Sequence, residues 1–145
     1  MVSPKEVINE LLVDLFNHIL SIESDVLKQK GVKLSMTEVH VLEAVRNVEV
    51  ATMGNVASKL RVTLGTLTTS VNVLVRKGYV IRERDEADRR KVYLTLTDNA
   101  HSVLKIHEAF HDEMLESVFK DLELEKNEVL MKSLENISDY FKKRY

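Results

Sequence analysis

Residues 63–78 read TLGTLTTSVNVLVRKG, a pattern typical of a helix with two different faces. Thr63 is a residue type that caps helix N-termini, and Lys77 followed by Gly78 is typical of a helix C-terminus. Apolar residues recur with helical spacing at Leu67, Val71 and Leu74. The opposite face carries small hydroxyl and amide side chains, namely Thr63, Thr66, Thr68, Thr69, Ser70 and Asn72. Because threonine and serine are poor helix formers, this face is better explained by recognition of a partner than by stability.

The segments on either side complete a winged helix-turn-helix. Thr52 opens a shorter preceding helix, so the helix-turn-helix covers about residues 52–77. The wing, about residues 79–96, contains strands predicted at 79–82 and 91–96, the second with strict alternation of apolar and polar side chains. The charged segment between the two strands is predicted to form the tip of a hairpin.

The charge distribution points to DNA. Residues 59–97 hold nine basic and four acidic side chains, whereas the whole chain carries a net charge of −2. A basic block in an acidic chain favours a polyanion-binding face, although a solvated charged surface is the alternative. Small side chains on the helix suit the major groove, and basic side chains on a thin loop suit the minor groove. We therefore assign to DNA, beside the helix face, Arg76, Lys77, Arg84, Asp88, Arg89 and Arg90.

Longer helices flank this core. Ser3, Pro4 and Glu6 are predicted to open a helix that runs to about Lys30, where Gly31 ends it. Ser35 and Glu38 form a second capping box, Thr97 opens a long helix to about Phe119, and a last apolar stripe runs from Val129 to Phe141. A first helix of roughly 25 residues exceeds what one small domain covers, which indicates packing on a partner chain.

Composition sets the fold class and excludes several functions. Four Gly and one Pro in 145 residues favour a mainly α fold with a small β component over an all-β one. The chain has no Cys, no apolar run of membrane-spanning length and no apolar signal core, so we expect a soluble cytoplasmic protein with no membrane partner. It has no nucleotide-binding Gly-rich loop and no His-Glu-x-x-His motif. We therefore expect neither an enzyme nor a cofactor.

Residues 35–97 resemble the DNA-binding core of the MarR (multiple antibiotic resistance regulator) family. The run Asp85-Glu86-Ala87-Asp88-Arg89-Arg90 matches the wing signature of that family, in which an Asp-x-Arg pair, here Asp88 and Arg90, places an arginine in the minor groove. Arg61 stands in the turn where the family often has Gly, and we expect an α-type backbone there that accepts Arg.

The MarR resemblance covers nearly the whole chain and implies one domain over residues 1–145. It implies a helical dimerisation region at 1–34 and 98–145, a homodimer, and two recognition helices that read a near-palindromic operator in double-stranded DNA. Residues 62–72 and 76–79 resemble more narrowly the recognition helix of the FabT-type repressors. That resemblance implies control of fatty-acid synthesis genes, with a long-chain acyl group on acyl carrier protein as corepressor.

Three histidines leave the effector open. His107 and His111 lie one helical turn apart, and in MarR-type folds their helix converges with those of His40 and Glu23. With Glu23 or Glu38 these histidines could bind zinc, as some family members do. They could equally line a pocket for a small aromatic or lipophilic ligand, or lie on an ordinary helix face. A protein-interaction module that does not bind DNA is the remaining alternative, distinguished by weaker salt dependence.

Overall fold

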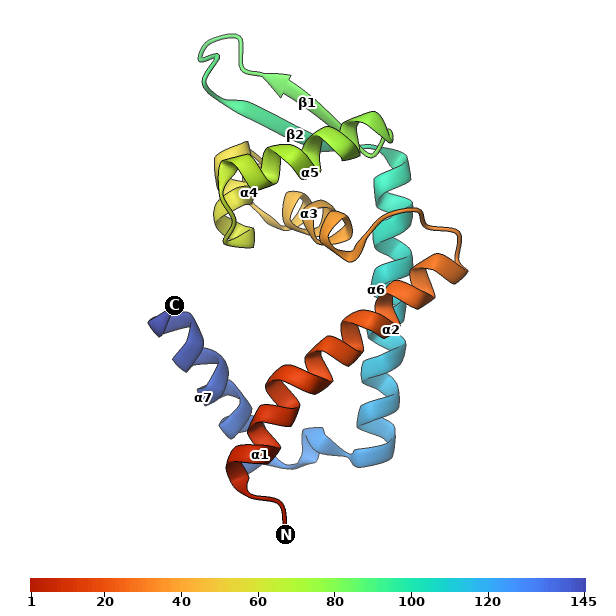
Figure 1. Ribbon diagram of the computed structural model, residues 1–145, viewed down its shortest axis with the longest axis vertical. Coiled ribbons are helices and arrows are strands. Elements are labelled where there is room, and N and C mark those ends of the chain that lie inside the picture. Colours follow the sequence, from red (N-terminus) through yellow and green to blue (C-terminus); the bar gives the residue numbers. More distant parts are fainter. The chain divides into compact units, whose positions relative to one another are not determined.

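The computed structural model describes residues 1–145 and confirms a mainly helical fold with one two-stranded antiparallel sheet (Figure 1). The elements in chain order are α1 (Pro4–Asn9), η1 (Glu10–Leu15), α2 (Phe16–Gln29), α3 (Met36–Asn47), α4 (Met53–Leu60), α5 (Leu64–Arg76), β1 (Val80–Arg84), β2 (Val92–Leu96), α6 (Asp98–Leu122), η2 (Leu124–Lys126) and α7 (Glu128–Arg144). Contacts divide the chain into two compact units, residues 1–108 and 109–145. None of the helices is long and apolar enough to cross a lipid bilayer.

The first helical run begins and ends where the sequence predicts. Ser3 Oγ accepts a hydrogen bond from the Glu6 backbone N–H, and Glu6 Oε2 accepts one from the Ser3 N–H at 2.7 Å. Gly31 ends the run with a φ of +81°. The sequence predicted one regular α-helix, but Glu10–Leu15 form a π-helical segment. The apolar spacing fits an α-helix throughout, so periodicity alone gives no sign of this wider turn.

The core of the first unit lies between α3, α4, α5 and the hairpin. The Ser35–Glu38 capping box is present at the start of α3. Side chains with no measurable exposure come from α3, α4, α5 and α6, namely Val39, Leu42, Val56, Val71, Leu74 and Ala100. The predicted inward stripe of α5 is therefore confirmed, and it fixes the opposite face of that helix as the exposed one.

The turn of the helix-turn-helix contains one of the two non-glycine residues with a positive φ. Thr52 and Thr63 cap α4 and α5 as predicted, each accepting a backbone hydrogen bond at 3.1 Å. Arg61, at the end of α4, has φ 58° and ψ 43°. We expected an α-type backbone there that accepts Arg, but the structure has the left-handed form, which a side chain with a Cβ adopts at a cost. This conformation explains why Gly is favoured at the corresponding position in similar turns.

Arg61→Gly is expected to stabilise the protein by about 1 kcal/mol, because Gly adopts this conformation without the Cβ clash. The gain would appear as a higher midpoint in urea unfolding. Arg61→Ala keeps the Cβ while removing the charge, so it should give no such gain. Equal midpoints for the Gly and Ala variants would contradict the assignment of strain to the backbone.

The wing is a regular hairpin whose first strand is longer than predicted. Its register runs from Val80 opposite Leu96 to Arg84 opposite Val92, so Glu83 and Arg84 belong to β1 and not to the tip. Polar strand residues are indistinguishable from loop residues by hydropathy, which explains the error. The Leu94 N–H donates to the Ala51 carbonyl at 2.8 Å and thereby joins β2 to the segment before α4.

The second unit consists of residues 109–145, with the end of α6, η2 and α7. Asn127 caps α7 by accepting a hydrogen bond from the Leu130 N–H at 3.0 Å. The two helices predicted for this part of the chain agree closely with α6 and α7, although α6 continues to Leu122. Several apolar side chains of this unit are exposed, namely Leu115, Leu122, Val129, Leu134 and Phe141.

Candidate nucleic-acid interface

The exposed face of α5 is the centre of the candidate interface. Leu67, Val71 and Leu74 face the core, and the opposite side of the helix is exposed to solvent. Of the assigned side chains, those exposed on α5 and its cap are Thr63, Thr66, Thr68, Thr69, Asn72 and Arg76. Ser70 is half-buried, and with Thr66 it borders a cavity of about 190 Å³ between α3, α4 and α5. The Ser70 side chain thus lies at the edge of the exposed face.

Two threonine hydroxyls of α5 use their hydrogens within the protein. Thr68 Oγ1 donates to the Leu64 carbonyl at 2.7 Å, and Thr69 Oγ1 donates to the Gly65 carbonyl at 3.2 Å. Thr68 and Thr69 therefore each offer a methyl group and an oxygen lone pair to a ligand. In a major groove, those groups match thymine methyls and exocyclic amino groups.

Arg82 is a functional candidate that the sequence analysis missed. Its Nη1 donates to Asn72 Oδ1 at 2.6 Å, which links the hairpin to the exposed face of α5. Alternation along β1 places Arg82 on the same face as the buried Val80, toward α5. That alternation was readable from the sequence, but the pairing with Asn72 depends on how the strand packs on the helix.

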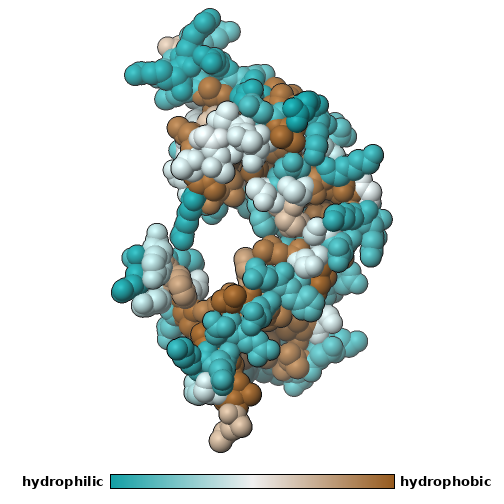
Figure 2. Space-filling view, in the orientation of Figure 1, coloured by the Kyte–Doolittle hydropathy of each residue, from teal (hydrophilic) through white to brown (hydrophobic).

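The tip of the wing is held by the predicted Asp-x-Arg pair. Asp88 Oδ1 accepts hydrogen bonds from the Arg90 backbone N–H and from Arg90 Nε, both at 3.1 Å. These bonds from Arg90 lower the pKa of Asp88, so Asp88 remains ionised at neutral pH. The pairing would be lost only as the pH falls through that lowered value. The Arg90 side chain is 92% exposed. Figure 2 shows a mostly hydrophilic surface over the wing.

The remaining assigned basic residues differ in their surroundings. Arg84 and Arg89 are exposed on the hairpin, as their assignment to DNA requires. Lys77 instead donates through Nζ to the Lys33 carbonyl at 3.1 Å and to Glu38 Oε2 at 3.3 Å. Those two acceptors connect the end of α5 to the segment before α3 and to α3 itself. The structure therefore gives Lys77 a bracing role in addition to its charge.

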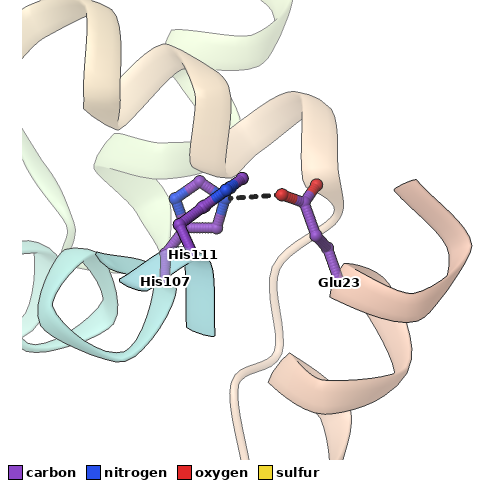
Figure 3. Close-up of side chains that lie close together, drawn as sticks. All are labelled: Glu23, His107 and His111. Carbon is purple, nitrogen blue, oxygen red and sulfur yellow. Dashed lines mark ion pairs between the residues drawn. The ribbon is translucent and has the colours of Figure 1, made fainter. Parts of the chain in front are cut away.

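Two of the predicted metal candidates meet in the core of the first unit. His107 and Glu23 are 2% and 3% exposed, and His107 Nε2 lies 3.4 Å from Glu23 Oε1 (Figure 3). His107 Nδ1 lies 3.7 Å from Glu43 Oε1, an acid that the sequence analysis missed although it follows His40 by three residues on α3. His40, Glu43 and His107 can bring one ligand atom each within 4.8 Å of one another. Glu38 is not part of this cluster, because it caps α3.

His111 follows His107 by one turn of α6, and it is half-buried (Figure 3). Its ring packs edge-on against Phe110, with 5.6 Å between the ring centroids.

Comparisons with known proteins identify the family. Residues 25–105 match the profile of the family described as Transcriptional regulator SarA/Rot. The chain belongs to the SarA/Rot family of transcriptional regulators. It is 28% identical over 104 residues to the HTH-type transcriptional regulator SarZ of Staphylococcus haemolyticus, an alignment covering 72% of this chain and 69% of that protein.

Solved structures confirm the MarR-type winged helix. Streptococcus pneumoniae FabT in complex with DNA superposes with a TM-score of 0.87 and 35% identity, over 97% of this chain and 99% of that one. Staphylococcus aureus MepR in complex with DNA superposes with a TM-score of 0.76 over 92% and 96% of the chains, and its 19% identity shows the fold alone. The protein is therefore a DNA-binding transcriptional regulator.

Proposed function

We propose that this SarA/Rot-family protein is a homodimeric repressor that reads a near-palindromic operator with α5 and its wing. One observation carries the proposal: the threonine face of α5 and the Arg90 side chain, which Asp88 holds, are both exposed. The first would enter successive major grooves and the second the flanking minor grooves. The relatives named above are bacterial, and bacterial DNA lies in the cytoplasm, so the proposed site of action is cytoplasmic.

Exposed apolar side chains support the homodimer. Along residues 7–22, large apolar side chains stay exposed in the single chain, including Ile8, Leu11, Leu12, Leu15 and Phe16. Contiguous apolar surface of this kind on a water-soluble helix marks an interface with another chain. Sedimentation equilibrium is expected to give twice the chain mass of 16.7 kDa. A chain-sized mass at micromolar concentration would contradict the dimer.

We further propose fatty-acid synthesis genes as the regulated set, with an acyl group on acyl carrier protein as corepressor. The support is the 35% identity to FabT across nearly the whole chain, together with the FabT-like residues of α5. The test is selection of genomic fragments by the purified protein at two salt concentrations, with and without acylated carrier protein. A palindrome upstream of fatty-acid synthesis genes, bound more tightly with the acyl protein, is the expected result. A palindrome elsewhere would overturn the gene assignment and leave the DNA-binding regulator.

Arg90→Ala is expected to weaken operator binding by about 1–3 kcal/mol while the protein stays folded, because it removes the minor-groove side chain. Electrophoretic or fluorescence titration at fixed salt measures the change. Lys105→Ala is the matched control, since it removes an exposed positive charge from α6, outside the proposed surface. Unchanged affinity in Arg90→Ala would show that the wing assignment is wrong.

A second candidate effector is a divalent transition metal such as zinc, favoured by the cluster of His40, Glu43 and His107. Two imidazoles and a carboxylate are a ligand set that zinc accepts. Glu23 faces the other ring nitrogen of His107, so it would orient that imidazole rather than bind the same ion. Zinc added to dialysed protein is expected to raise the melting temperature, and His40→Ala is expected to abolish that rise. No bound zinc on elemental analysis and no thermal shift would exclude this effector.

A further inference from the structure

Gly65 lies in the first turn of α5, on the exposed face of that helix, and lacks a structural reason to be glycine. Residues 65, 69, 72 and 76 follow one another at spacings of four, three and four, so they form the line opposite the buried stripe. Because Gly65 has no side chain, the helix backbone itself is exposed at this position of the line. Beside it, the Thr69 hydroxyl is turned back to the Gly65 carbonyl at 3.2 Å.

The fold does not require glycine at this position. Gly65 is not among the residues with a positive φ, which are Gly31, Gly78, Arg61 and Glu123. A Cβ built on Gly65 would meet only Thr63 Oγ1, at 3.9 Å, an ordinary contact distance. Alanine would therefore fit the protein without strain.

Glycine also costs stability here. Within a helix, Gly is less favourable than Ala, because its backbone loses more freedom on folding. A residue that lowers stability and fills no steric need in the protein is best explained by a ligand that approaches the backbone closely. On a DNA-binding regulator, that ligand is DNA.

We propose that Gly65 is the point of closest approach between α5 and the operator, where a base edge in the major groove packs directly on the Gly65 Cα. Its neighbours on the same face include Thr68 and Thr69, whose side chains are short and whose hydroxyls are turned back to the helix. A Cβ at residue 65 would stand between the helix and the base and would hold α5 away from the groove. The other side chains of the exposed face would then lie too far from the bases that they contact.

The structure provides a matched control in Gly54. Gly54 is the second residue of α4, after the cap Thr52, just as Gly65 is the second residue of α5, after the cap Thr63. A Cβ on Gly54 would meet nothing within 4 Å. Gly54→Ala and Gly65→Ala therefore make the same chemical change at the same helical position, and only the second lies on the proposed contact line.

The test measures thermal unfolding and DNA affinity for both variants of the full-length protein. The probes are an operator fragment selected with the wild-type protein and random-sequence DNA of equal length. We expect both variants to melt at or above the wild-type temperature. We expect Gly65→Ala to lose roughly 5- to 150-fold in operator affinity, which corresponds to the usual overpacking cost of about 1–3 kcal/mol. Gly54→Ala should bind the operator like the wild type.

The inference is overturned if Gly65→Ala binds the operator with wild-type affinity, or if Gly54→Ala loses as much. An equal loss of operator and random-sequence binding in Gly65→Ala would also overturn the placement on a base edge, because random-sequence binding depends on phosphate contacts. A lower melting temperature in Gly65→Ala alone would show that the glycine serves the fold. The test holds for whatever operator the protein selects, so it is separate from the assignment to fatty-acid synthesis genes.

Discussion

Leu67→Asp is expected to unfold the DNA-binding core. Leu67 is 1% exposed at the centre of the packing between α3, α4 and α5. The substitution removes a buried leucine, a change that costs about 2–5 kcal/mol, and adds an uncompensated carboxylate that costs several more. Because whole domains are stable by only about 5–15 kcal/mol, most of the folded population should be lost.

Leu64→Asp is the matched control for this prediction. Leu64 lies three residues earlier on the same helix, but it is 56% exposed, so the same substitution meets water. An acid in the first turn also interacts favourably with the helix dipole. Far-ultraviolet circular dichroism and thermal unfolding should show a folded Leu64→Asp and a largely unfolded Leu67→Asp. Similar unfolding curves for the two variants would contradict the packing described for α5.

Features encoded by neighbouring residues were predictable. The caps Thr52 and Thr63 accept hydrogen bonds from backbone groups three residues away, so their signal lies within one helical turn of sequence. The pairing of Asp88 with Arg90 is equally local, and its geometry matches the prediction. The buried stripe of α5 follows from helical spacing alone. These features together give the winged helix-turn-helix before any tertiary contact is considered.

Features that depend on packing between distant segments were missed. Arg82 lies ten residues from Asn72, and Lys77 lies 44 residues from its acceptor on Lys33. No periodicity or capping rule connects such pairs, because each depends on how a strand or loop packs against α5. The left-handed backbone of Arg61 was missed for a different reason, since an arginine carries no local signal for a conformation that favours glycine.

Glu23→Ala is expected to destabilise the protein by about 1–3 kcal/mol, because it removes the buried carboxylate that faces His107 Nε2. Asp25→Ala, two residues along the same helix and exposed, should change stability little. Urea unfolding in the presence of a chelator measures both variants without any contribution from metal. Equal midpoints for the two variants would show that Glu23 and His107 are not energetically coupled.

The double variant Glu23→Leu with His107→Leu shows where that free energy arises. A buried polar pair is often replaceable by apolar residues of similar volume at little cost, whereas removing one partner leaves the other unsatisfied. Glu43, which also faces His107, is about one-third exposed and can be hydrated when the histidine is gone. The double variant is therefore expected to be more stable than Glu23→Ala. If it is less stable, the pair contributes net stability of its own, and the cluster is then a structural element of the core whether or not it binds a metal.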